Sequence, residues 1–202
     1  MPDEYTDSIF VNCPFDSEYK PFFNAIVFAI YKCGYLPRCA FEIDDASEAR
    51  ISKIAKIIGE CRLGVHDISR TELSTGGLPR FNMPLELGLF FGAKFYGGKV
   101  QKTKRCLVFD RDPYRYQQFI SDIAGQGVTS HDGEIRTAVT KLRDWLATIR
   151  HHLPGGGVVW DEYQVFLTEL PEICQASQLI EEDLIFADYV RIVYEWLQIR
   201  ES

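Results

Sequence analysis

The sequence lacks any run of the roughly 18 apolar residues that a membrane-spanning helix needs, although 46% of the chain is hydrophobic. Its acidic start, MPDEYTDSIF, also lacks the basic segment and apolar stretch that open a secretory signal. We therefore expect a cytoplasmic protein with no membrane partner.

Paired cysteines are missing as well. The six cysteines are scattered, none belongs to a C-x-x-C pair, and several fall inside apolar runs, which is typical of reduced core thiols. His151 and His152 have no residue of a metal-ligating type close by in sequence. We expect neither a disulfide framework nor a metal site.

Positive charge is scarce, because 22 Lys and Arg stand against 29 Asp and Glu, a net charge of -7. Nucleic-acid-binding proteins hold the phosphate backbone with a broad basic surface. The composition therefore argues against a nucleic-acid partner, and it is still compatible with a small basic pocket. A chain of 202 residues with 13% aromatic residues is globular, with room for one core and a helical appendage.

Short β-rich runs alternate with segments of helical periodicity through the first three quarters of the chain. We expect strands in residues 8–15, 35–41, 62–69 and 104–110, a short extended segment at 126–131, and helices over 18–33, 44–59, 83–98, 113–125 and 132–152. Asp45 and Glu48 have the spacing of a capping box for the second helix. This alternation predicts an α/β fold, with a doubly wound, mostly parallel sheet of about five strands.

The segment HHLPGGGVVW, residues 151–160, interrupts this alternation with a proline and three glycines. Two helical segments follow it with no strand between them. We therefore divide the chain into an α/β domain, residues 1–153, and a C-terminal helical extension, residues 158–202. The extension is expected to be a hairpin that packs on the sheet domain or serves self-association.

Polar side chains gather where the expected strands end, which is the edge at which open parallel sheets bind ligands. The residues in question are Asn12, Phe15 and Asp16 after the first strand, Arg38 after the second, His66, Asp67, Ser69, Arg70 and Glu72 after the third, and Arg80 and Asn82 before the next helix. The aromatic ring is suited to stacking on a base, and the arginines are suited to phosphate.

Glu86 is the one charged residue between Met83 and Ala93. Placed in the first turn of its helix, the carboxylate would lie near unsatisfied N–H groups and could stay ionised despite burial. Gly88 and Gly92 would let this helix approach the sheet closely. An ionised, positioned carboxylate suits attack on, or stabilisation of, the oxocarbenium-like C1′ of a ribose.

The segments SIFVNCPF, HDIS and PLELGLFFGAKFYGGK resemble the opening strand, the third-strand end and the E-x-G-x-A helix of the nucleoside 2-deoxyribosyltransferases. A helix Glu after the third strand is also the catalytic position of the TIR-domain NAD hydrolases. The resemblance covers roughly residues 7–150 and implies a doubly wound α/β sheet with TIR-like, flavodoxin-like layering. It implies that Glu86 is the nucleophile or ribose-binding carboxylate, that Asp67 has a catalytic or substrate-binding role, and that Phe15 flanks the base.

Two departures from the deoxyribosyltransferase pattern favour another substrate. Arg80 and Asn82 stand where that family has an acidic residue, and the first strand ends in NCPF without the family's tyrosine or small Gly. The resemblance then implies cleavage of the N-glycosidic bond of NAD or a related nucleotide, with no other cofactor. In the TIR-like families such activity often belongs to bacterial immune or toxin systems that assembly switches on, here into a homo-oligomer through the C-terminal helices.

The alternative is a catalytically silent nucleotide-binding sensor or adaptor with the same fold. A flavodoxin-like or response-regulator-like scaffold fits less well. The first strand does not end in the paired acids that hold Mg²⁺ in receivers, and no Ser/Thr/Gly-rich phosphate loop for a flavin is present.

Overall fold

The computed structural model describes residues 4–42, 46–71 and 80–201, and it contains one parallel sheet of five strands. The strand order is β2-β1-β3-β4-β5, and every neighbouring pair is parallel. The strands are β1 Ser8–Asn12, β2 Leu36–Arg38, β3 Leu63–Asp67, β4 Arg105–Asp110 and β5 Val128–Ser130. This order confirms the doubly wound α/β fold, and its topological switch point lies between β1 and β3.

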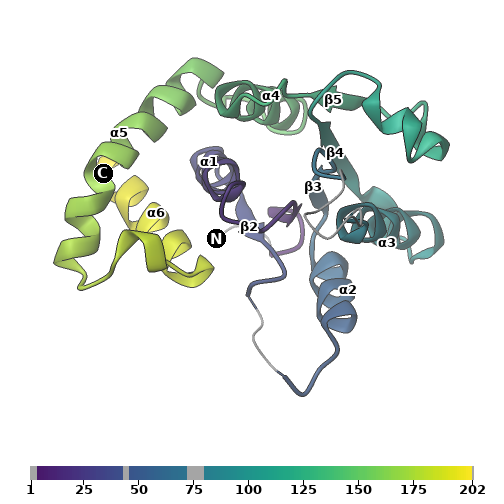
Figure 1. Cartoon of the computed structure of the whole chain (residues 1–202), viewed down its shortest axis with the longest axis horizontal. Helices are drawn as coiled ribbons and strands as arrows, with labels where there is room; N and C mark the ends of the chain where they lie inside the picture. Colours follow the sequence, from purple (N-terminus) through teal and green to yellow (C-terminus); the bar gives the residue numbers. More distant parts are fainter. Residues whose placement is uncertain (1–3, 43–45, 72–79, 202) are drawn as a thin grey trace.

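Six α-helices surround the sheet in the described part of the chain. They are α1 Lys20–Lys32, α2 Arg50–Glu60, α3 Asn82–Tyr96, α4 Ile135–Ala147, α5 Gly156–Ala176 and α6 Phe186–Glu201. Figure 1 shows α2 and α3 on one side of the sheet and α1 and α4 on the other, with α5 and α6 lying outside α1.

The strands alternate between the two faces as their period of two requires. In β1, Ile9 and Val11 join the core under α1 and α4, whereas Phe10 joins the core under α2 and α3. Helix α1 is apolar nearly all round, with residues 25–30 all buried, because it lies between the sheet and the C-terminal hairpin. Gly34 ends α1 as expected, with the positive φ of 74° that glycine adopts without strain.

Close packing of α3 on the sheet depends on Gly64 in β3. A Cβ atom there would lie 2.8 Å from the ring of Phe90, so only glycine leaves room for that side chain. The expectation that Gly88 and Gly92 perform this role is wrong. A Cβ atom at either position meets nothing within 4 Å, and Gly88 is exposed on the outer side of the helix.

The helical segments differ from the sequence-based expectation most clearly in three places. Helix α2 begins at Arg50 after an N-cap at Ala49 without a side-chain cap, so the predicted capping box does not cap this helix, and Asp45 lies outside the described residues. Residues 113–125 form two short 3-10 helices, Arg115–Gln118 and Ser121–Ile123, in place of one α-helix. Helix α4 ends at Ala147, ahead of the predicted end at His152.

The C-terminal hairpin packs on α1 and α4. Tyr189 Oη donates a 3.0 Å hydrogen bond to the carbonyl of Asn24, and the ring of Phe28 lies 5.3 Å from that of Phe166. Buried residues of α5 and α6 belong to the same hydrophobic cluster as those of α1, α4 and three strands. The hairpin therefore packs on the sheet domain, as one of the two alternatives predicted, and self-association through it stays a prediction.

Across the described ranges, none of the helices is both long enough and apolar enough to cross a bilayer.

Candidate functional site

Asn12 and His66 lie side by side at the carboxyl ends of β1 and β3. This is the edge of the sheet at which the sequence analysis predicts a ligand. The Asn12 amide lies 3.0 Å from His66 Nδ1 and donates a 2.8 Å hydrogen bond to the carbonyl of Met83. Both side chains are buried, and burial lowers the pKa of His66 to about 3, so the imidazole is neutral. The pair connects both strands to the start of α3.

Asp67 is fully buried and points to the opposite face of the sheet. Its carboxylate accepts hydrogen bonds from the Tyr19 hydroxyl and from the backbone N–H of Ser69, the latter at 2.7 Å. His131 Nε2 lies 3.1 Å from the same carboxylate, although its N–H is not aligned with the oxygen. Burial, together with the charge of Asp67, raises the pKa of Tyr19, so the hydroxyl keeps its proton and donates it.

Arg115 connects the end of β4 with the segment that follows β3. Its guanidinium lies 2.5 Å from Asp110 Oδ1, at the end of β4, and donates a 2.6 Å hydrogen bond to the carbonyl of Ser69. Ser69 is therefore held by its main chain on both sides, by Asp67 and by Arg115.

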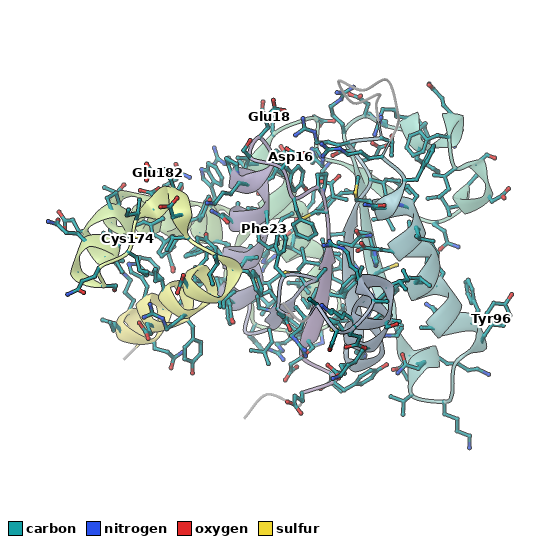
Figure 2. All side chains as sticks on the ribbon, turned by 60° about the horizontal axis from the view of Figure 1, so that its bottom comes forward. Asp16, Glu18, Phe23, Tyr96, Cys174 and Glu182 are labelled. Carbon is teal, nitrogen blue, oxygen red and sulfur yellow. The ribbon has the colours of Figure 1, made fainter. Side chains whose placement is uncertain are left out.

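Asp16 holds two of the predicted phosphate-binding arginines. Its Oδ1 lies 2.6 Å from Arg70 and its Oδ2 lies 2.7 Å from Arg80, and Arg70 also contacts Glu18. Figure 2 shows Asp16 and Glu18 at one end of the molecule. These ion pairs join the loop after β1 to the loop after β3 across the switch point.

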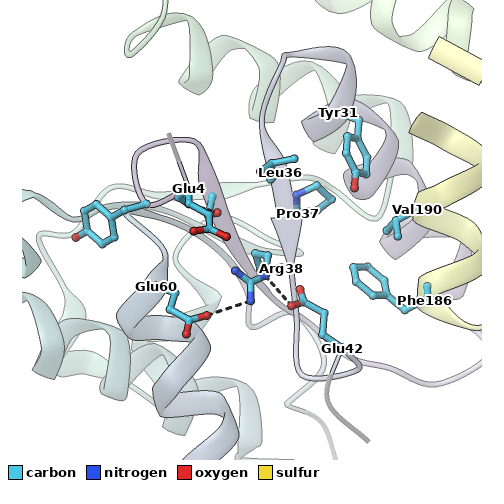
Figure 3. A pocket seen from close by; sticks show the side chains of 12 residues that line it. Glu4, Tyr31, Leu36, Pro37, Arg38, Glu42, Glu60, Phe186 and Val190 are labelled. Atoms are coloured by element: carbon cyan, nitrogen blue, oxygen red, sulfur yellow. Dashed lines mark hydrogen bonds and ion pairs between the residues drawn. The ribbon is translucent and has the colours of Figure 1, made fainter. Parts of the chain in front are cut away.

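Arg38 lies apart from the other two arginines, as the last residue of β2 at the edge of the sheet. It pairs with Glu42 at 2.6 Å and with Glu60 at 3.1 Å on the wall of a cavity of about 670 Å³ (Figure 3). Tyr31, Leu36, Pro37, Phe186 and Val190 line the same cavity. The two carboxylates neutralise Arg38 in this arrangement.

Glu86 is the fifth residue of α3, and the first turn of this helix contains no acidic residue. The expected stabilisation by the helix N-terminus is therefore wrong. The side chain is 5% exposed, and its Oε2 has no hydrogen-bond partner among the described residues. Burial raises the pKa of the Glu86 carboxyl to about 7, and the charge of Arg50 offsets part of that effect.

The raised pKa of Glu86 predicts that ionisation of this carboxyl lowers the free energy of unfolding as the pH rises. The unfolded chain loses this proton near the ordinary pKa of 4.5 and the folded chain near 7, so stability falls between these pH values. Glu86→Gln should therefore raise the free energy of unfolding at pH 8 by up to about 3 kcal/mol and leave it nearly unchanged at pH 4. Urea unfolding at both pH values measures this. An equal effect of the substitution at both would contradict the assignment.

A second cavity, of about 640 Å³, opens where β1 and β2 end. Its cationic side chains are Lys20 at the start of α1 and Arg50 and Lys53 in the first turn of α2. Phe15 and Phe41 provide aromatic rings with centroids 4.3 Å apart. Phe23, Ile185 and Phe186 are among the apolar residues that complete the lining.

Arg50 connects this cavity to Glu86. Its side chain lines the cavity, and its charge acts on the Glu86 carboxyl. Cys13 is the residue after β1, and burial and then the charges of Asp67 and Glu86 raise the pKa of its thiol. Glu86 itself is not among the residues that line the cavity.

Apart from Arg38, Asn82 and Glu86, the predicted site residues that the structure describes fall into three overlapping groups. Asn12, His66, Asp67 and Ser69 are buried in contacts within the chain, Asp16, Arg70 and Arg80 form an ion-pair cluster, and Phe15 and Asp16 reach the second cavity. Asn82, the first residue of α3, is exposed, and Glu72 lies outside the described residues.

Several residues of this region were missed by the sequence analysis. His131 and Arg115 come from segments after β5 and β4, and no short motif indicates them. Arg50 and Lys53 had a signal, since two cations three residues apart at the start of a helix share one face.

Comparison with known proteins does not assign the chain to a family. No protein-family model matches the chain, and no curated protein matches it either.

Proposed function

We propose that the protein binds a nucleotide at the carboxyl edge of its sheet and cleaves an N-glycosidic bond, with NAD as the leading substrate. The observation that carries this proposal is Glu86, a buried carboxyl with an oxygen that lacks a partner among the described residues and a pKa of about 7. Such perturbed groups concentrate at functional sites. Arg50, whose charge acts on the Glu86 carboxyl, lines the cavity in which we place the ligand.

In the reaction that we assign to this site, the bond from ribose C1′ to nicotinamide is replaced by a bond from C1′ to the oxygen of water. The bond between nicotinamide N1 and ribose C1′ breaks, and its electron pair neutralises the positive ring of the leaving nicotinamide. The oxygen of water then bonds to C1′, and the proton of that water passes to solvent. The ionised carboxylate of Glu86 would stabilise the positive charge that develops at C1′, or attack this carbon and be displaced by water.

Charge favours an anionic ligand at this cavity despite the acidic chain. Lys20, Arg50 and Lys53 are its cations, whereas Asp16 is the acid among the described lining residues. Asp16 is already compensated by Arg70 and Arg80. A phosphate group would therefore meet the positive charges of Lys20 and Arg50, and Phe15 and Phe41 offer faces for a base.

The second candidate is a nucleotide sensor without chemistry. It is favoured by the absence of Glu86 from the described cavity lining and by the ion pairs that engage Arg38, Arg70 and Arg80. A sensor would bind the nucleotide saturably and leave it intact.

Incubation of the purified protein with NAD separates the two candidates. An NAD hydrolase should release nicotinamide and ADP-ribose in equal amounts, as measured by chromatography. A rate per molecule that rises with protein concentration would support the further proposal that self-association through α5 and α6 activates the protein. Saturable binding, seen as a thermal shift without product, would favour the sensor, and intact NAD and nucleosides at every concentration would overturn the hydrolase.

A further inference from the structure

The cavity beside β1 and β2 has a wall that lies outside the α/β unit predicted from the sequence. Leu184, Ile185, Phe186, Ala187 and Tyr189 all line it, and they belong to the α5–α6 connection and the start of α6. Figure 1 shows α6 beside α1, the helix that supplies the facing side.

The connection is fixed against the sheet domain at the mouth of this cavity. Lys20 Nζ donates a 2.7 Å hydrogen bond to the carbonyl of Glu182, and the rings of Phe23 and Phe186 lie 5.8 Å apart. An ammonium group has three donors, so Lys20 retains capacity to bind an anion while it holds the connection.

The two sides of the cavity differ in chemistry. The α1 and α2 side carries the cations Lys20, Arg50 and Lys53, and the hairpin side is apolar, with Ile185 63% exposed. A volume of about 640 Å³ is within the range of small-molecule sites. A ligand that fills it would place an anionic group on one side and an apolar ring on the other.

We propose that the α5–α6 connection is a specificity-determining wall of the nucleotide site, in which Ile185 contacts the base while Lys20, Arg50 and Lys53 hold the phosphates. This inference rests on the proposed function for the identity of the ligand. It gives the C-terminal hairpin a role in ligand recognition.

Two matched substitutions in the connection test the wall. Ile185→Glu places a carboxylate at the cavity, whereas Ile180→Glu adds the same charge at a residue that is 62% exposed and outside the described lining. Both are made in the full chain carrying Glu86→Gln, so that no ligand is consumed. Calorimetry with ADP-ribose should show at least about tenfold weaker binding for Ile185→Glu and a change within about twofold for Ile180→Glu.

The probes themselves test the assignment of the two sides. Adenosine and inorganic pyrophosphate should each bind at least about tenfold more weakly than ADP-ribose, because each occupies one side only. Phe41→Ala should weaken ADP-ribose binding, with Phe81→Ala as the control, since both rings are exposed and only Phe41 lines the cavity.

The outcomes separate this inference from the proposed function. If NAD binding is sensitive to Ile185→Glu and wild-type protein leaves NAD intact, the hydrolase fails and the wall stands. If NAD is cleaved with the same KM when Ile185→Glu and Ile180→Glu are each introduced alone, with Glu86 retained, the hydrolase stands and the wall fails. If no nucleotide probe binds, or if both substitutions weaken binding equally, the wall is overturned.

Discussion

Glu86→Gln is expected to reduce the rate of NAD cleavage by roughly a thousandfold or more, since loss of a nucleophile or charge-stabilising group typically costs this much. Glutamine keeps the size of the side chain and removes the negative charge that the ribose cation requires. Binding of ADP-ribose should change little. Single-turnover assays, with calorimetry on the same samples, measure both quantities.

The pH dependence of the wild-type protein provides an independent check on this carboxylate. Because the ionised form is needed and the pKa of Glu86 is about 7, the rate should rise as the pH passes from 6 to 8 and then level off. Glu172→Gln, an exposed position on α5, is the matched control and should keep the wild-type rate and profile. Full turnover by Glu86→Gln protein would falsify the proposed role.

Asp67→Ala should destabilise the fold by about 3–5 kcal/mol, the largest stability effect expected here. The substitution leaves the Tyr19 hydroxyl, the Ser69 N–H and the His131 ring buried beside a void. Urea unfolding should show a lower midpoint with an unchanged slope. Asp161→Ala, at an exposed position on α5, should change stability by no more than about 0.5 kcal/mol.

A double-mutant cycle identifies the partner that matters most to Asp67. Tyr19→Phe removes the hydroxyl that donates to this carboxylate, so its effect should shrink once Asp67 is already alanine. A coupling energy of about 1–3 kcal/mol is expected for this buried pair. Strict additivity of the two substitutions would show that the contact contributes nothing to stability.

The sheet could be predicted from the sequence because its information is local. SIFVN, LGVHD and RCLVFD are short β-rich runs, and the helical segments between them require parallel crossovers. The 3-10 region after β4 could not be predicted in the same way. Its conformation follows from contacts of Arg115 with β4 and the β3 end, which are distant in sequence.

The position of the candidate side chains could be predicted from the sequence, and their contacts could not. The strand-end rule led to Asn12, His66 and Asp67, which do lie at the carboxyl edge. Which of these side chains are already satisfied depends on Tyr19, His131 and Met83, whose approach is a tertiary matter. The misjudged ionisation of Glu86 has a simpler cause. Helix α3 begins at Asn82, one residue before the predicted start, and this shift takes the carboxylate out of the first turn.

The burial of α1 on every side has a consequence for any attempt to divide the chain. Phe28 packs on Tyr163, Phe166 and Trp196, all of which follow the glycine-rich break. A polypeptide ending at residue 153 would expose the apolar surface of α1 around Phe28 to water, and we expect it to aggregate or to be degraded by proteases. The glycine-rich break therefore lies between two parts of the chain that share one hydrophobic core.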